Sequence, residues 1–460
     1  MNLFQYIETI KDKKITVIGA GVSNMPLIRT LLMCGCSVTV RDKRSIETMG
    51  MEALSLINQG ARLKLGEDYL DGITEDVIFR TPGLMPFDPH LTEAAARGSV
   101  LTSEMEIFFR VCPCHTVAVT GSDGKTTTST ILAELLTAAG KRVHLGGNIG
   151  TPLLCESAEM LPTDYAVLEL SSFQLHSMIC KPEISVITNI SPNHLDKHKD
   201  YQDYIDAKRA IFENQDEGDR LILNAADGQT PYYRSGARAQ VAYFSDSVPI
   251  ENGVFADETD IYRVHDGQKT RIMKKSEIRI PGEHNVQNYM AAFAALDGIV
   301  SDEICREVAM RFAGVEHRLE LVRELRGVKY INDSIGSSPS RTVAGLHAMP
   351  VKPIVIAGGY DKCIPFDTLG DELCLRAKHV ILTGATAEKI RTAIESSSHY
   401  ADSGLRVDMV EDFKEAVLLA HASAQSGDIV LLSPACAAFD RFKNFAERGK
   451  YFKEIVMELT

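Results

Sequence analysis

A glycine-rich segment at residues 116–130 carries the clearest chemical signal in the chain. Its sequence is TVAVTGSDGKTTTST, in which Gly121 and Gly124 precede Lys125 and Thr126. In such a loop, backbone N–H groups point at phosphate oxygens, the lysine adds a positive charge, and the threonine hydroxyl can hold Mg²⁺. The full G-x-x-x-x-G-K-[ST] pattern would have another glycine five positions before Gly124, where this chain has valine. The segment is therefore a shortened variant, and it predicts that the chain binds a nucleoside triphosphate.

Polar residues that follow two other predicted strands could complete a site around this loop. Glu169 ends the apolar run at 165–169, and His194 follows the predicted strand at 184–190. Because ligands collect at the carboxyl ends of strands in open α/β sheets, we expect both side chains beside the loop as Mg²⁺ or substrate ligands. Taken alone, either residue would more often be a helix cap or a loop hydrogen-bonding group, and the phosphate loop is what favours the ligand interpretation.

Charged residues near the ends of later strands suggest a second face of the site. Arg318 precedes a strand at 328–331, Asp333 follows that strand, and Lys362 follows the strand at 353–357. We expect these side chains to face a nucleotide and an anionic substrate. The alternative is that they are solvated loop charges.

Other metal-binding residue types occur without the spacing of a metal site. They form one H-x-x-x-H pair and two C-x-C pairs, at His194/His198, Cys34/Cys36 and Cys112/Cys114. None of these pairs has the further ligands that a tetrahedral zinc site requires. We therefore expect no structural zinc.

The N-terminal segment reads as a βαβ unit. A strand at 14–18, a Gly19-Ala20-Gly21 turn, a helix to about residue 33 and a strand at 37–40 lead to Asp42. This resembles the start of a dinucleotide-binding fold, although asparagine replaces the third glycine of the fingerprint. Three interpretations stay open: a nucleotide-type fold with another ligand, an NAD(P) site, or a structural turn.

Alternating strands and helices continue along the whole chain and define its fold class. Strands are expected at 77–79, 116–119, 165–169, 184–190, 221–224, 328–331, 353–357, 380–382 and 429–432. Such alternation with 10–15-residue helices predicts an α/β chain with mostly parallel sheets flanked by helices. Residues 228–280 are instead irregular and β-rich, and they suggest a small appended sheet. We expect three domains, at residues 1–103, 104–314 and 315–460.

Composition limits the partners and the compartment. The 460 residues carry 62 acidic and 49 basic side chains, a net charge of −13, which argues against nucleic acid as the main partner. No apolar run of membrane-spanning length and no signal peptide is evident, and the 10 cysteines are scattered. We expect a cytoplasmic protein with reduced thiols and no membrane partner.

Taken together, these motifs resemble the Mur ligases, the ATP-dependent enzymes that add amino acids in peptidoglycan synthesis. The resemblance covers essentially the whole chain in order. Its loop motifs are TGSDGKTT at 120–127, GNIG at 147–150, ELSSFQ at 169–174, HNVQN at 284–288, HR at 317–318, NDS at 332–334 and LSPACA at 432–437. The closing segment at 439–449 is most similar to the members that add D-glutamate.

The resemblance implies a role for each domain and for named residues. The domains would be a Rossmann-like one for the UDP substrate, a P-loop ATPase, and a dinucleotide-fold domain that closes over amino acid and ATP. ATP would contact Gly121, Ser122, Asp123, Gly124, Lys125, Thr126, Thr127, Asn285, Asn288, Arg318 and Asp333. The UDP-muramoyl part would contact Val22, Ser23, Asp42, Lys43, Gly83, Asn148 and Gln174, and D-glutamate would contact Ser337, Lys362 and Phe445.

The resemblance also implies two Mg²⁺ ions and a modified lysine. Thr126 and Glu169 would serve the first ion and His194 the second. Lys208 would be carbamylated, which converts a repelling ammonium into an anionic metal ligand. Lys125, His194 and Lys208 would then be the catalytic residues.

The implied reaction joins UDP-N-acetylmuramoyl-L-alanine and D-glutamate in two steps. The L-alanyl carboxylate attacks the γ-phosphate of ATP, and the amine of D-glutamate then displaces phosphate from the acyl phosphate. We expect a monomer that catalyses by positioning and charge neutralisation, without a protein nucleophile. Two alternatives stay open: another Mur ligase or folylpolyglutamate-synthetase-like amino-acid ligase, and a redox or non-catalytic nucleotide-binding protein.

Overall fold

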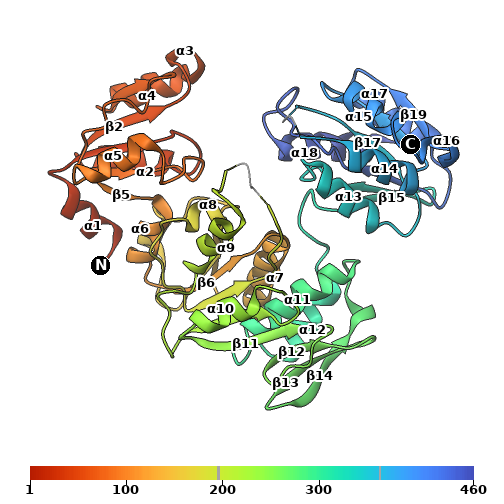
Figure 1. Ribbon diagram of the computed structural model, residues 1–460, viewed down its shortest axis with the longest axis horizontal. Coiled ribbons are helices and arrows are strands. Elements are labelled where there is room, and N and C mark those ends of the chain that lie inside the picture. The colour runs from red at the N-terminus through yellow and green to blue at the C-terminus, as the bar shows by residue number, and fades with distance from the viewer. Residues whose placement is uncertain (194–196, 362–363) are drawn as a thin grey trace. The chain divides into compact units, whose positions relative to one another are not determined.

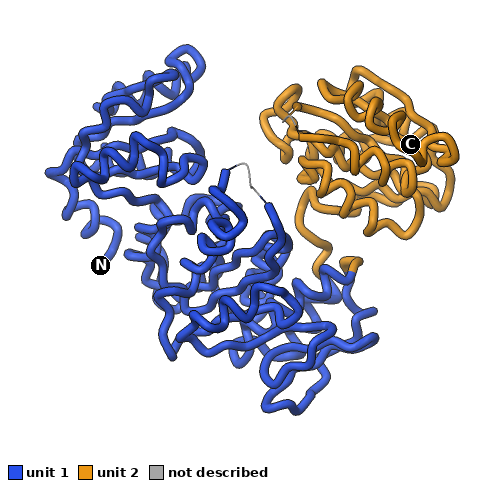
Figure 2. Tube along the Cα trace, viewed as in Figure 1, with its two compact units in different colours: residues 1–279, 283–311 blue, residues 280–282, 312–460 orange. Residues whose placement is uncertain are grey.

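The computed structural model describes residues 1–193, 197–361 and 364–460, which form helices and strands along the whole chain (Figure 1). The chain divides into two units, residues 1–279 with 283–311, and residues 280–282 with 312–460 (Figure 2). The first unit contains two sheets and the second contains one. The predicted fold class, an α/β chain with three mostly parallel sheets flanked by helices, is confirmed. The domain boundaries at 103/104 and 314/315 stay a prediction.

The N-terminal sheet has five parallel strands in the order β3-β2-β1-β4-β5. The strands are β1 (Lys14–Ile18), β2 (Ser37–Asp42), β3 (Arg62–Leu65), β4 (Val77–Phe79) and β5 (Val100–Thr102). The helices are α1 (Leu3–Ile10), α2 (Met25–Met33), α3 (Ile46–Met49), α4 (Met51–Asn58) and α5 (Pro89–Ala96), and α6 (Glu104–Val111) leads to the next sheet. The strand order reverses between β1 and β4, and in doubly wound sheets ligands bind at such a switch point.

The central sheet has nine strands in the order β14-β13-β12-β11-β10-β9-β6-β8-β7. The strands are β6 (His115–Thr120), β7 (Val143–Gly147), β8 (Tyr165–Glu169), β9 (Ile184–Ile187), β10 (Arg220–Asn224), β11 (Gln240–Ser245), β12 (Gly253–Ala256), β13 (Asp260–His265) and β14 (Gln268–Lys274). The helices are α7 (Lys125–Ala138), η1 (Glu156–Glu159), α8 (Ser172–Leu175), α9 (Tyr201–Arg209), α10 (Thr230–Gly236), η2 (Lys275–Glu277), α11 (Glu283–Ala295) and α12 (Asp302–Arg311).

The β-rich segment at 228–280 does not form an appended sheet, so that prediction was wrong. Strand β11 pairs in parallel with β10, and β12, β13 and β14 extend the same sheet, with β13 and β14 antiparallel. Local sequence identifies such strands but not the edge that they join. That edge is set by side-chain burial, here of Phe244 and Val254.

The C-terminal sheet has six strands in the order β15-β16-β20-β17-β18-β19, all parallel except β15. The strands are β15 (Glu320–Leu325), β16 (Val328–Asn332), β17 (Ile354–Ala357), β18 (His379–Leu382), β19 (Arg406–Met409) and β20 (Ile429–Leu432). The helices are α13 (Pro339–His347), α14 (Asp367–Arg376), α15 (Ala387–Glu395), α16 (Tyr400–Ser403), α17 (Phe413–Ser423) and α18 (Phe445–Glu458). Across the described residues of both units, every helix is too short or too polar to span a membrane.

Candidate active site

The glycine-rich loop joins β6 to α7, and both of its glycines are required by the geometry. Gly121 has φ 148° and Gly124 has φ 79°, and residues that carry a side chain rarely adopt backbone conformations with such positive φ angles. A Cβ at Gly121 would collide with the hydroxyl of Thr188, and a Cβ at Gly124 would collide with the side-chain oxygen of Asn288. The backbone can therefore approach an anion closely at the N-terminus of α7.

The residues after β9 hold this loop in place. The backbone N–H of Ser122 donates to the carbonyl of Asn189 (2.8 Å), and that of Asp123 donates to the side-chain Oδ1 of Asn189 (3.0 Å). The hydroxyl of Thr188 donates to the Asp123 carbonyl (2.6 Å). The hydroxyls of Ser122 and Tyr204 lie 2.8 Å apart. Sequence reasoning did not assign a role to Thr188 or Asn189, because the predicted strand at 184–190 included both, whereas β9 ends at Ile187 and leaves them in the loop.

Lys125 lies over the loop that it follows. Its Nζ donates to the carbonyl oxygens of Gly121 (3.0 Å) and Ser122 (2.9 Å), and the side chain is half-buried. The positive charge is thus held at the mouth of the anion cradle. A phosphate placed there would be attracted by both the ammonium and the helix N-terminus.

Glu169 lies beside Thr126 because strands β6 and β8 are neighbours in the sheet. The Thr126 hydroxyl donates to Glu169 Oε2 (2.6 Å), and Asn148 Nδ2 donates to Oε1 of the same carboxylate (2.8 Å). Glu169 is buried, while Asn148 is exposed. A threonine hydroxyl and a carboxylate are hard oxygen donors, so this pair fits the ligand preference of Mg²⁺.

Lys208 is a buried lysine next to the same loop. Its Nζ donates to the Gly121 carbonyl (2.9 Å) and to the Thr120 hydroxyl (3.4 Å), and it lies 4.6 Å from the centre of the Tyr204 ring. Burial, followed by the positive charge of Lys125, lowers the pKa of Lys208 well below its usual value. This direction of the pKa shift favours the neutral amine form of Lys208 over the charged ammonium form.

Two asparagines of α11 close one side of the loop. Thr128 donates to Asn288 Oδ1 (3.2 Å), and Asn288 Nδ2 donates to Asn285 Oδ1 (3.2 Å). Both asparagines are buried, and so is Thr127, whose hydroxyl lacks a hydrogen-bond partner among the described residues. Of the residues predicted to contact ATP, those from Gly121 to Asn288 lie in the first unit, whereas Arg318 and Asp333 belong to the second.

In the N-terminal sheet, Asp42 fixes the turn that follows β1. It accepts hydrogen bonds from the backbone N–H of Ala20 (2.8 Å) and from Arg44 Nη2 (3.0 Å) and Nε (3.0 Å). Although burial is the largest influence and opposes ionisation, these bonds with Arg44 and Ala20 prevail and lower the pKa of Asp42. Asn24, where a third glycine was expected, donates to the carbonyls of Ile18 (3.1 Å) and Gly19 (3.1 Å). The turn is therefore closed by side chains, while Val22, Ser23, Lys43 and Gly83 are exposed.

A small cavity of about 20 Å³ lies between this turn and the central sheet, lined in part by Ser23, Arg80, Glu104 and Gln174. Arg80 is buried and donates from Nη2 to the carbonyls of Phe173 (2.9 Å) and of His176. Burial lowers the pKa of Arg80 to about 10 and raises that of Glu104 to about 7. Sequence reasoning missed Arg80 and Glu104, since only burial distinguishes them from surface charges.

Gln174 is oriented by its own helix cap. The backbone N–H and hydroxyl of Ser171 both donate to Gln174 Oε1, at 3.0 and 2.9 Å. The side chain is buried at the edge of the cavity.

In the second unit, Asp333 lies at the carboxyl end of β16. Its Oδ2 accepts from the hydroxyl of Ser433 (2.8 Å), which follows β20, and its Oδ1 accepts from the N–H of Leu319 (3.4 Å). Burial raises the pKa of Asp333 to about 6. Arg318 and Ser337 are half-buried, and each has further polar or electrostatic contacts.

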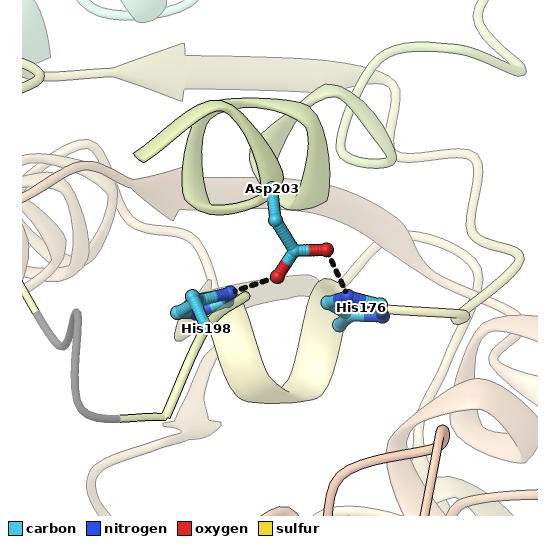
Figure 3. Close-up of side chains that lie close together, drawn as sticks. All are labelled: His176, His198 and Asp203. Atoms are coloured by element: carbon cyan, nitrogen blue, oxygen red, sulfur yellow. Dashed lines mark hydrogen bonds and ion pairs between the residues drawn. The ribbon is translucent and has the colours of Figure 1, made fainter. Parts of the chain in front are cut away.

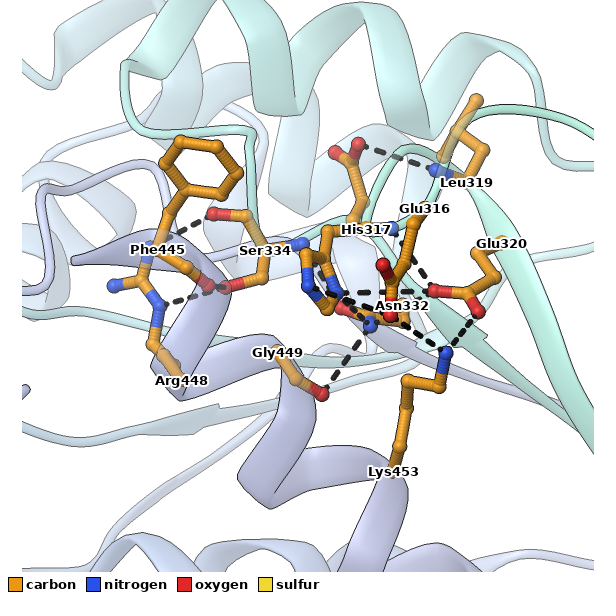
Figure 4. Close-up of polar contacts among 11 residues, drawn as sticks. Glu316, His317, Leu319, Glu320, Asn332, Ser334, Phe445, Arg448, Gly449 and Lys453 are labelled. Carbon is orange, nitrogen blue, oxygen red and sulfur yellow. Dashed lines mark hydrogen bonds and ion pairs between the residues drawn. The ribbon is translucent and has the colours of Figure 1, made fainter. Parts of the chain in front are cut away.

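Two buried side chains, Arg448 of α18 and His317 before β15, contact residues at and just after the end of β16 (Figure 4). Arg448 donates to the Ser334 carbonyl (2.9 Å) and hydroxyl (3.0 Å), and Ser334 donates to the carbonyl of Phe445 (2.7 Å). His317, with φ 65°, lies 2.9 Å by its Nδ1 from Asn332 Nδ2 and meets the Phe445 ring edge-on. Phe445 itself is 38% exposed. Sequence reasoning assigned no role to Arg448.

Two predicted site residues, His194 and Lys362, lie outside the described residues. The remaining predicted residues form three groups: the loop with Glu169 and Lys208, the turn after β1 with the cavity, and the loops after β16 with the start of α18. The first two groups belong to one unit and the third to the other.

A glycine loop at a helix N-terminus beside a buried carboxylate, at the end of a mostly parallel sheet, is typical of the class of nucleotide-binding α/β proteins. Residues 119–296 match the Mur ligase middle domain, and residues 317–436 match the Mur ligase, glutamate ligase domain. The chain belongs to the Mur ligase family.

Two relatives that share one name are similar to this chain over nearly its whole length. The chain is 46% identical to UDP-N-acetylmuramoylalanine–D-glutamate ligase of Ruminiclostridium cellulolyticum. The alignment spans 460 residues and covers 99% of each chain. It is 45% identical over 458 residues to the enzyme of the same name from Acetivibrio thermocellus, covering 99% of this chain and 98% of that one.

Solved structures of other family members share the fold. MurF from Acinetobacter baumannii aligns with a TM-score of 0.62 and 16% identity, over 99% of this chain and 98% of that one. MurF ligase from Thermotoga maritima, solved in complex with ADP, aligns with a TM-score of 0.53 and 15% identity, over 98% and 97%.

Proposed function

We propose that this chain is an ATP-dependent ligase that joins D-glutamate to UDP-N-acetylmuramoyl-L-alanine in peptidoglycan precursor synthesis, through an acyl-phosphate intermediate. The observation that carries this proposal is the 46% identity over 99% of both chains to a relative of that name. We also propose that the protein is located in the cytoplasm and acts as a monomer.

ATP would occupy the loop between β6 and α7. The positive φ angles of Gly121 and Gly124 keep side chains out of the cradle, and Lys125 supplies a charge at its mouth. We assign phosphate contacts to residues 121–127, and base or ribose contacts to Asn285, Asn288, Arg318 and Asp333. The ADP complex of the Thermotoga relative supports nucleotide binding by this fold.

Mg²⁺ would be held by the hydroxyl of Thr126 and the carboxylate of Glu169, and His194 would serve a second ion. The 2.6 Å hydrogen bond between Thr126 and Glu169 brings two hard oxygen ligands close together and supports this assignment. Mg²⁺ supplies charge neutralisation to the transferring phosphoryl group when it is bound. Asn148 keeps the carboxylate oriented by donating to its other oxygen.

Lys208 would react with CO₂ to form a carbamate. The neutral amine attacks the carbon of CO₂, one proton leaves the nitrogen, and the product carries a carboxylate at its end. Only the unprotonated amine is a nucleophile, and burial lowers the pKa of Lys208 in the required direction. The resulting anion would face the region of Gly121 and Lys125 and could help to hold the metals.

The protein's own contribution to the reaction would be positioning and electrostatics. The UDP-muramoyl substrate would lie along Val22, Ser23, Asp42, Lys43, Gly83, Asn148 and Gln174, with its L-alanyl carboxylate directed to the ATP loop. D-glutamate would be held by Ser337, Lys362 and Phe445. Lys125 would stabilise the negative charge on the phosphate oxygens while the γ-phosphoryl group is transferred from ATP to the substrate carboxylate.

Phosphate release from ATP in the presence of UDP-N-acetylmuramoyl-L-alanine tests the proposal. We expect release with D-glutamate and little with L-glutamate, L-lysine or meso-diaminopimelate. Preference for one of the other amino acids would reassign the chain within the family. A lack of ATP turnover with every amino acid would refute the ligase assignment itself.

A further inference from the structure

Three side chains of metal-binding types, none of them part of the Thr126–Glu169 pair, lie together where α8 meets α9 (Figure 3). His176 follows α8, Asp203 lies in the first turn of α9, and His198 precedes that helix. His176 Nε2 lies 2.9 Å from Asp203 Oδ1, and His198 Nδ1 lies 2.8 Å from Asp203 Oδ2. Within the described part of the chain, no other group of three or more His, Cys, Asp or Glu residues meets the same spacing.

We propose that His176, His198 and Asp203 form a binding site for a divalent transition metal of the Zn²⁺ type. Two imidazole nitrogens and a carboxylate oxygen are a donor set that zinc accepts in sites that keep one position open. Imidazole favours such metals over Mg²⁺, which takes oxygen ligands. The site therefore differs in chemistry from the pair formed by Thr126 and Glu169.

The surroundings orient His198 as metal sites usually orient a histidine ligand. Its second nitrogen, Nε2, lies 2.9 Å from the hydroxyl of Ser172, so Ser172 can accept a hydrogen bond from Nε2–H and fix the tautomer whose Nδ1 is free to bind a metal. The ring stacks on Phe173 with centroids 5.4 Å apart and meets Tyr204 edge-on at 5.3 Å. The side chain is fully buried, so its Nδ1 is held toward Asp203.

The other two ligands leave the site accessible from one side. The side chains of His176 and Asp203 are 20% and 16% exposed, so a metal ion and a water ligand can enter there. Burial also lowers the pKa of His198, and the neutral ring is the form that binds a metal. The backbone N–H of Lys199 donates to Asp203 (3.3 Å) and helps to orient the carboxylate.

Occupancy of this site would connect two helices with roles in the proposed function. Helix α8 carries Gln174 and helix α9 carries Lys208. A metal bound to His176 and Asp203 would tie these helices by coordination bonds in addition to hydrogen bonds. Metal binding itself does not depend on the ligase assignment, so it can be tested separately.

The test measures metal binding to tag-free protein in excess Mg²⁺, which occupies hard oxygen sites. Co²⁺ is the probe, because coordination by nitrogen and oxygen in an open site gives a visible absorption band. We expect one equivalent of Co²⁺ that Zn²⁺ displaces. His176→Ala and Asp203→Asn should each abolish the band, and Ser172→Ala should weaken binding about 10- to 100-fold.

His144→Ala is the matched control. His144 Nε2 lies 3.0 Å from Asp164, so this variant removes a similar His–Asp pair that has no second imidazole. It should bind Co²⁺ like the wild type. Circular dichroism verifies that each variant is folded, and His176→Gln replaces any His176→Ala protein that is not. Equal binding by the wild type and a folded His176 variant, or no binding by the wild type at micromolar metal, would overturn the proposal.

Discussion

The hydroxyl of Thr126 donates a 2.6 Å hydrogen bond to the buried carboxylate of Glu169, although 43 residues separate them in the chain. The contact exists because β6 and β8 are adjacent and parallel, with Val119 paired to Glu169. The glycine loop that follows β6 then carries Thr126 over the end of β8. Two hard oxygen ligands therefore meet at the N-terminus of α7, where the helix dipole favours an anion.

Lys125→Ala should reduce turnover by a factor on the order of 10³ or more, because it removes a charge that stabilises the transferring phosphoryl group. The fold should persist, since the half-buried side chain donates to carbonyls of its own loop and is not part of a hydrophobic core. The measurement is steady-state phosphate release. Lys141→Ala, which removes an exposed lysine beyond the far end of α7, is the control. Activity of Lys125→Ala within tenfold of wild type would refute the role of the loop.

Asp42→Ala should weaken binding of the UDP substrate roughly 10- to 150-fold, which corresponds to losing one charge-assisted hydrogen bond of about 1.5–3 kcal/mol. The reason is that Asp42 holds both Ala20 and Arg44 at the turn after β1. Affinity for ATP should change little, and titration calorimetry measures both ligands.

Asp76→Ala is a matched control for that variant, because Asp76 accepts from the backbone N–H of Lys14 at the opposite end of the same strands (2.8 Å). It should leave both affinities near wild type. Loss of ATP affinity in Asp42→Ala, with normal UDP-substrate binding, would show that the N-terminal domain was misassigned.

Sequence reasoning succeeded where chemistry follows from local pattern. The strand at 429–432 was predicted with its exact ends, and Glu169 was placed near the loop because both follow parallel strands. It failed where a contact depends on tertiary packing. Arg80 donates to the carbonyls of Phe173 and His176, which lie 93 and 96 residues further along the sequence, and only the packed structure reveals these partners. Asp203 likewise reads as a residue of the first helical turn, and nothing local pairs it with His176.

The buried carboxyl of Asp333 should make stability depend on pH. Its pKa is raised from 3.8 to about 6 by burial, so the folded state binds more protons than the unfolded state between those values. Stability is therefore fully present at low pH and is lost as the pH rises through about 6. The maximal loss is about 3 kcal/mol for a shift of about two units.

Asp333→Asn isolates this effect because asparagine stays neutral and can still accept from Ser433. We expect the variant to become more stable relative to wild type as the pH rises from about 4 to about 7. Thermal unfolding of both proteins at several pH values measures the difference. A difference that is constant across this range would show that Asp333 is not the titrating group.

Lys208→Ala should be inactive and should regain part of its activity when short-chain carboxylic acids such as acetate are added. The substitution leaves space next to Gly121, whose carbonyl now accepts from the lysine. A small carboxylate that enters this space can replace the oxygens of a carbamate, but it cannot replace an ammonium. Lys208→Arg separates the two roles, because arginine keeps the positive charge and is not carbamylated. If the carbamate is required, the arginine variant is inactive, and wild-type activity falls in bicarbonate-free buffer and returns with bicarbonate. An active Lys208→Arg enzyme, or full wild-type activity without bicarbonate, would show that the lysine acts as a cation.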